Sequence, residues 1–236
     1  MQLFLSGCKK ALPVAIGYLP IGLACGLLLF QAGFSLGQIA LMSILVLSGA
    51  SQFMLAGLVS QGLGTWEIML ILLALHLRSI VLTSTQAAYY QGVSNWQMAL
   101  LGFAVTDESF AVNMTQLELA HEKPGQTWTY TQALAVNLTS QLAWLVATWL
   151  GGLTALWGGL TLPTDILNYV LTAMFIGLLV MQVKTRAQVS LVAFTSILVV
   201  TLMVIFDHSL VIVAAALASA YLAFHYLDRR RGVRHE

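Results

Sequence analysis

Charged residues are scarce in this chain of 236 residues: only 8% are Asp, Glu, Lys or Arg, whereas 59% are hydrophobic. A water-soluble domain carries about 25% charged residues, so this chain has too few charges to cover a soluble surface of its size. The formal net charge of +1 points to no nucleic acid and to no acidic soluble partner. The sequence therefore predicts an integral membrane protein whose surroundings are the lipid bilayer.

Cysteine is almost absent as well, with only Cys8 and Cys25 in the chain. Cys8 precedes the first apolar run and Cys25 lies inside it, so we do not expect an intrachain disulfide. The sequence contains no CxxC pair and no Cys/His cluster with the spacing of metal ligands. We therefore predict neither a metal ion nor another cofactor.

Long apolar runs fill the rest of the chain. A membrane-spanning helix needs about 20 mostly apolar residues, and these runs lack the short alternation of transmembrane strands. The predicted fold class is all-α, a polytopic membrane helix bundle with about eight transmembrane helices, or about seven in the alternative. The expected helices cover residues 11–31, 37–60, 67–90, 97–117, 130–155, 167–183, 188–206 and 209–227.

One polar stretch, residues 118–129, divides the single expected membrane domain (1–236) into halves of about 11–117 and 130–227. With eight spans, this loop, every Lys and Arg cluster and both termini fall on one side, which the positive-inside rule makes cytoplasmic. The clusters are Lys9–Lys10, Lys123, Lys184–Arg186 and Arg229–Arg234. A re-entrant arrangement around Asp207 is the alternative for the last two spans.

Two short sequence segments in the first two spans resemble segments later in the chain. Pro20–Leu23 resembles Phe175–Leu178, and Ser43–Leu47 resembles Ser196–Val200. The offset of five expected spans reverses the direction through the membrane. This pattern is typical of an inverted repeat with broken helices, a common plan among transporters, although apolar words also recur by chance.

Arg78 lies inside an apolar run, where a charge costs roughly 2.5–3.5 kcal/mol on insertion scales. Residues equidistant from the centre of a short loop share one depth in antiparallel neighbours. The loop centre near Gly92 places Asp107 level with Arg78, close to the bilayer midplane, and Glu108 beside it. We expect an ion pair of Arg78 with one of these carboxylates at a substrate site; a pair that only neutralises itself is the alternative.

A run of small and polar residues interrupts the second apolar segment at the same depth. Gly49, Ala50, Ser51 and Gln52 predict either close helix packing or a broken helix whose free N–H and C=O groups bind a zwitterion. Pro20 also lies near mid-depth. It frees a backbone carbonyl for an ammonium group or only kinks its helix.

His76 stands two residues before Arg78, so the two side chains point to nearly opposite sides of a helix. His76 is either a proton carrier or a packing residue, and Asp107 and Glu108 are further candidates for proton coupling. The constellation favours a carrier for a small aliphatic zwitterion. An intramembrane hydrolase with a Ser51–His76 dyad and a membrane scaffold without transport are the alternatives.

Three motifs resemble a known family: Gly49–Phe53, Leu77–Arg78 and Thr106–Ala111. They are similar to the azaleucine-resistance (AzlC-type) family, whose members are large subunits of branched-chain amino acid exporters, and Leu19–Gly26 is similar to its first span. One difference is that the family usually has Asn-Leu-Arg where this chain has His-Leu-Arg, beginning at His76.

The resemblance implies a transporter and not an enzyme. Its expected substrates are valine, leucine and isoleucine, with methionine as a further candidate, exported across a bacterial inner membrane. It also implies a partner, a small AzlD-type membrane subunit encoded separately.

Overall fold

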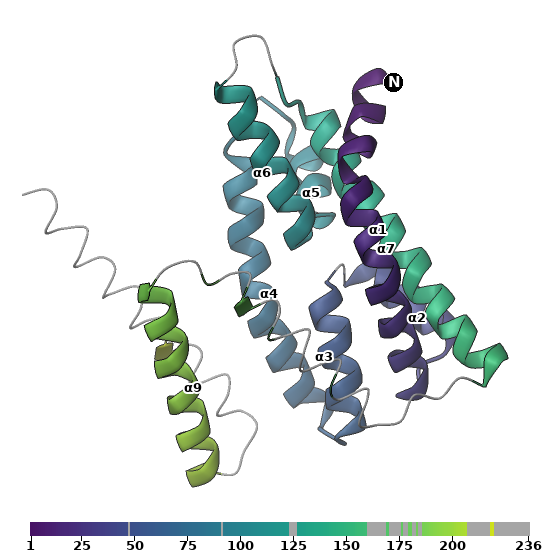
Figure 1. Ribbon diagram of the computed structural model, residues 1–236, viewed down its shortest axis with the longest axis vertical. Helices are drawn as coiled ribbons and strands as arrows, with labels where there is room; N and C mark the ends of the chain where they lie inside the picture. The colour runs from purple at the N-terminus through teal and green to yellow at the C-terminus, as the bar shows by residue number, and fades with distance from the viewer. Residues whose placement is uncertain are drawn as a thin grey trace, which may run out of the picture. The chain divides into compact units, whose positions relative to one another are not determined.

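The computed structural model describes residues 1–46, 48–90, 92–122, 127–159 and 186–206, and the single positions 169, 176, 179, 180, 183, 218 and 219. In this part of the chain all regular elements are helices (Figure 1). The helices are α1 (Gln2–Gln31), α2 (Leu36–Leu45), α3 (Gly49–Ser60), α4 (Thr65–Ala87), α5 (Asn95–Phe103), α6 (Asp107–Glu122), α7 (Tyr130–Gly158) and α9 (Arg186–Phe206).

The chain divides into two compact units. The first contains Met1–Gly62 and Leu75–Asn168, and the second contains Leu63–Ala74 and Tyr169–Glu236. All predicted site residues belong to the first unit, to which α4 contributes its second half. In the second unit, α9 matches the span expected at 188–206.

Four helices of the described residues are long and apolar enough to cross a membrane: Gln2–Gln31, Thr65–Ala87, Tyr130–Gly158 and Gln188–Ile205. They confirm the spans expected at 11–31, 67–90, 130–155 and 188–206, so the chain is a helical membrane protein. The spans expected at 167–183 and 209–227 lie mostly outside the described residues, as do the turn at Asp207 and the repeat word at Phe175–Leu178.

The expected second span, 37–60, is not one membrane-crossing helix. It is broken into α2 and α3. Ser43 of α2 bonds Thr148 of α7 at 2.8 Å, while Ile39, earlier in α2, lies against Gly152, later in α7. Therefore α2 runs antiparallel to α7.

The next helix, α3, turns back beside α2. It is joined to α4 by a short turn, and Ser51 of α3 faces His76 of α4, so α3 and α4 are antiparallel. The end of α4 leads to Tyr90, whose ring contacts that of Tyr130 at the start of α7, so α4 is antiparallel to α7. It follows that α3 runs parallel to α7 and opposite to α2. The two helices form a re-entrant pair, the first hairpin.

The expected fourth span, 97–117, is a second hairpin. Along α5, the Gln97 carbonyl accepts from the Tyr130 hydroxyl at 3.0 Å and the Leu101 carbonyl accepts from Asn137 Nδ2 at 3.1 Å, so α5 runs parallel to α7. Along α6 the order is reversed: Asn113 donates to Asn137 at 2.9 Å, and Leu117, one turn later, packs against the same hydrophobic cluster as Tyr130, at the start of α7.

The prediction of two crossing spans is therefore wrong, and the cause is helix capping inside the apolar runs. The Ser48 side chain accepts from Ser51 N at 3.3 Å and begins α3. Thr106 and Ser109 bond each other reciprocally, at 2.9 and 3.2 Å, where α6 begins. A cap satisfies the N–H groups of a new helix start, so the chain can break and reverse within the bilayer.

Helices α1 and α7 form the frame against which both hairpins pack (Figure 1). They lie parallel, since Ser6 contacts Gln132 and Gly22 contacts Ala147. A Cβ added to Gly26 would overlap the Thr148 carbonyl oxygen. The backbones of the two helices are therefore in direct contact at Gly26, a close approach that small residues permit between membrane helices.

Candidate functional site

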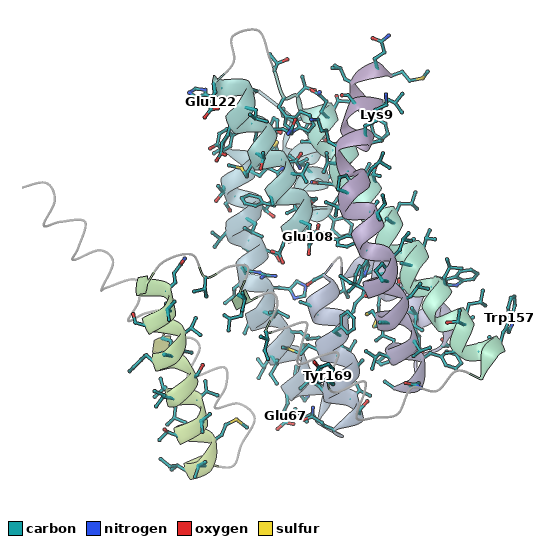
Figure 2. All side chains as sticks on the ribbon, viewed as in Figure 1. Lys9, Glu67, Glu108, Glu122, Trp157 and Tyr169 are labelled. Carbon is teal, nitrogen blue, oxygen red and sulfur yellow. The ribbon has the colours of Figure 1, made fainter. Side chains whose placement is uncertain are left out.

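The two hairpins enter from opposite ends of α7 and present their turns near its middle. We call Ser48–Gln52 the first tip and Thr106–Ser109 the second tip. Each tip is the N-terminal end of a helix, α3 or α6, so each carries the partial positive charge of a helix dipole. Figure 2 shows Glu108, at the second tip, about halfway along the first unit.

Helix α4 contacts both tips through residues on different sides of the helix. His76 Nδ1 lies 3.5 Å from Ser51 Oγ of the first tip, and His76 Nε2 lies 3.4 Å from the Val46 carbonyl at the end of α2. Arg78 reaches Asp107 of the second tip. The expectation that His76 and Arg78 point in different directions is met, and each contacts one tip.

The expected ion pair of Arg78 is formed with Asp107, to which Arg78 Nη2 donates a short hydrogen bond. Both side chains are one-third exposed, at 33% each, so the pair is neither sealed in protein nor freely solvated. Arg78 Nε is buried and has no hydrogen-bond partner among the described residues. The guanidinium therefore keeps a donor that Asp107 does not use.

Glu108 is separated from that pair. Its carboxylate accepts from the Tyr18 hydroxyl at 2.5 Å, and the same hydroxyl lies 2.9 Å from Thr106 Oγ1. Within the described residues Glu108 forms no ion pair. Tyr18 was not predicted, because only depth distinguished it: it lies two residues before Pro20, which the sequence places near the midplane.

The first tip presents donors. The first N–H groups of a helix have no acceptor within it, and the described residues show none for those of Gly49 and Ala50. Gln52 is fully buried. Its Oε1 accepts from Trp144 Nε1 at 3.1 Å, while its Nε2 has no hydrogen-bond partner among the described residues.

Trp144 of α7 explains why position 49 is a glycine. A Cβ there would lie 2.7 Å from Cη2 of the indole, so the ring occupies the space of a side chain. Trp144 also meets Tyr18 edge to face, with ring centroids 5.1 Å apart. The α1–α7 frame thus holds Trp144 at the first tip and Tyr18 at the second.

Pro20 is not brought to the tips. Its side chain is exposed, and α1 continues through it as one helix. Pro20 lies two positions after Tyr18, so the two side chains point to nearly opposite sides of α1. The structure thus gives no support to Pro20 as the residue that frees a backbone carbonyl for the ammonium group of a substrate.

Ser51 and His76 are within reach of each other, as the hydrolase alternative requires. However, Ser51 is only 1% exposed, and its hydroxyl donates to Ser48 Oγ at 3.0 Å. A nucleophile must approach the reacting carbonyl closely, and this hydroxyl is enclosed. The arrangement disfavours hydrolysis at Ser51.

The chain is similar to several curated membrane proteins. It is 26% identical to the inner membrane protein YgaZ of Escherichia coli over 193 residues, which cover 80% of this chain and 77% of YgaZ. It is 25% identical to the branched-chain amino acid transport protein AzlC of Bacillus subtilis over 179 residues, covering 76% of this chain and 67% of that protein.

A third relative is an uncharacterized membrane protein of Archaeoglobus fulgidus, 32% identical over 187 residues and 78% of each chain. No solved structure matches this chain. The family model described as AzlC protein matches residues 13–157, which include both hairpins, all of α4, and most of α1 and α7. This match covers more than half of the chain, which therefore belongs to the AzlC family.

Proposed function

We propose that this protein is a carrier that exports valine, leucine or isoleucine, with methionine as a further candidate, from the cytoplasm. One observation carries the proposal: two helix starts meet α4 near its middle, one rich in unused donors and the other in carboxylates. The name of the relative in Bacillus subtilis agrees with it. The structure and the relative support a carrier by independent routes.

The first tip suits the carboxylate of an amino acid. The N–H groups of Gly49 and Ala50 and the dipole of α3 favour an anion. Gln52 Nε2 at this tip is a buried donor without a hydrogen-bond partner in the described structure, and Arg78 Nε of α4, the helix that contacts both tips, is another. An anion at this tip would satisfy groups whose burial otherwise costs free energy.

The second tip suits the ammonium group. The charge of Asp107 neutralises that of Arg78, so the carboxylate of Glu108 is the negative charge left at this tip for an ammonium group. If Glu108, Asp107 or His76 takes up a proton when the ammonium leaves, transport is coupled to protons. The apolar surroundings favour an aliphatic substrate side chain.

We further propose a cytoplasmic N-terminus in a bacterial inner membrane. Lys9 and Lys10 lie near the start of α1, at the end of the frame where Ser6 bonds Gln132 at 3.0 Å. The positive-inside rule places this end in the cytoplasm, and a cytoplasmic C-terminus is the matching expectation. A small AzlD-type subunit is the expected partner.

Efflux of labelled leucine from preloaded cells tests the function, with and without the small subunit. We expect Arg78→Ala to lower efflux by roughly 10- to 100-fold, because a hydrogen bond to a charged group contributes about 1.5–3 kcal/mol. Immunoblots of the membrane fraction check insertion. Normal efflux by an Arg78→Ala protein that is inserted in the membrane would contradict the role of Arg78 in the substrate site.

The same assay separates the alternatives. If the wild-type chain with its partner moves no aliphatic amino acid, a scaffold without transport is favoured. A hydrolase would need the Ser51 hydroxyl, so Ser51→Ala would abolish its activity. For a carrier we expect efflux within about threefold of wild type, because this substitution removes one neutral hydrogen bond.

A further inference from the structure

Two adjacent carboxylates at the second tip have sharply different partners. Asp107 pairs with Arg78, and Glu108 accepts from Tyr18. A guanidinium has five N–H donors and could serve both carboxylates. Something must therefore keep Glu108 apart.

We propose that Tyr18 is a positioning residue that holds Glu108 out of the Arg78–Asp107 pair and presents it to the ammonium group of the substrate. This inference rests on the proposed transport of amino acids. Tyr18 contributes only a neutral hydroxyl to Glu108, so the carboxylate is oriented while its charge is not balanced.

The surroundings of Tyr18 suit this role. Its side chain is only 7% exposed, and its ring is fixed against Trp144. The hydroxyl contacts both Glu108 and Thr106, at 2.5 and 2.9 Å, so it meets the start of α6 at two points. A buried aromatic side chain has few rotamers to lose, and it fixes the position of its polar end.

The ring contact between Tyr18 and Trp144 also links the two ends of the proposed substrate site. Trp144, which supports the Tyr18 ring, donates to Gln52 of the first tip at 3.1 Å. The Tyr18–Trp144 pair therefore connects the donor-rich tip to Glu108. The separation of the two tips, and hence the length of zwitterion that they accept, depends on this pair.

Transport kinetics in proteoliposomes containing the chain and its small subunit test the inference. Tyr18→Phe removes the hydroxyl and keeps the ring. We expect KM for leucine to rise about tenfold, the size of one lost hydrogen bond to a charged group, with Vmax within about twofold. Tyr130→Phe is the matched control and should leave KM unchanged, because within the described part of the chain that hydroxyl bonds the Gln97 carbonyl at 3.0 Å and no residue of the two tips.

A double variant separates positioning from a merely structural role. If Tyr18 acts through Glu108, Tyr18→Phe adds nothing to KM in a Glu108→Gln background. The proposal would be overturned if the two substitutions raised KM independently, so that their factors multiplied in the double variant. It would also be overturned if Tyr18→Phe lowered Vmax and left KM unchanged.

Infrared spectra provide a readout that needs no substrate. The difference between the wild-type and Glu108→Gln proteins isolates the carboxylate stretch of Glu108. We expect Tyr18→Phe to shift that band and Tyr130→Phe to leave it in place; an unshifted band would refute the positioning role. If no aliphatic amino acid is transported, the proposed function fails, while this band still reports whether Tyr18 holds Glu108.

Discussion

At the scale of single residues, the sequence predicted the depth of the charged side chains in the membrane, but it did not predict which carboxylate each of them contacts. Arg78 and Asp107 are equally far from the loop centre between Gly92 and Val93, and they form the expected pair. The prediction survives the reversal at the second tip because it depends only on the path down to Asp107, which is the same whether the chain then continues or turns back. Which carboxylate pairs with Arg78 was decided by Tyr18, 90 positions from Glu108 in the chain.

Gly49 permits a test at this scale. We expect Gly49→Ala to destabilise the protein by about 1–3 kcal/mol, as overpacking does, because the new methyl group would lie 2.7 Å from the Trp144 ring. Thermal unfolding in detergent, followed by tryptophan fluorescence, measures the change. The control is Gly37→Ala, since a Cβ at Gly37 meets nothing within 4 Å; equal melting temperatures for both variants would contradict the packing argument.

At the scale of elements, the breaks were partly foreseeable. The small and polar run at Gly49–Gln52 suggested a broken helix, and α3 begins there. The break before Asp107 was missed, since 97–117 is long enough to cross the membrane. Thr106 followed three positions later by Ser109 is the local signal, a reciprocal N-cap pair that a hydropathy pattern does not record.

Cysteine labelling tests the hairpins directly. In a background without Cys8 and Cys25, Gly37→Cys and Gln61→Cys lie near the two ends of the first hairpin, and Trp96→Cys and Glu122→Cys near those of the second. A membrane-impermeant maleimide should reach both members of the first pair from outside. It should reach both members of the second pair only from the cytoplasmic side. A pair split between the two sides would indicate a crossing span.

At the scale of the first unit, the α1–α7 frame sets the positions of both tips. Helices with small residues at their interface can approach to backbone contact, and this frame places Tyr18 and Trp144 edge to face. The hairpins then pack against the frame and α4. A change in the α1–α7 distance should therefore disturb both tips together.

Gly26→Ala tests this dependence. We expect a loss of about 3 kcal/mol or more, because the added Cβ would overlap the Thr148 carbonyl oxygen, which is backbone and cannot rotate away. The measurement is the yield of monodisperse protein in detergent together with its melting temperature. Gly17→Ala in the same helix meets nothing within 4 Å and should behave as wild type; a stable Gly26→Ala protein would show that the helices can separate without harm.

The sequence alone determined that this is a helical membrane protein with charge at mid-depth. Long apolar runs without the alternation of transmembrane strands form helices in lipid, and a charge there needs a counter-charge. Its motifs also indicated the AzlC family, which the match over residues 13–157 confirms. Only the tertiary structure decided that two of the expected spans turn back, and that Tyr18 separates Glu108 from Arg78. Hydropathy reports how apolar the surroundings of a segment are, whereas its direction after a break depends on hydrogen bonds to a distant helix, such as those of Asn137 to Leu101 and Asn113.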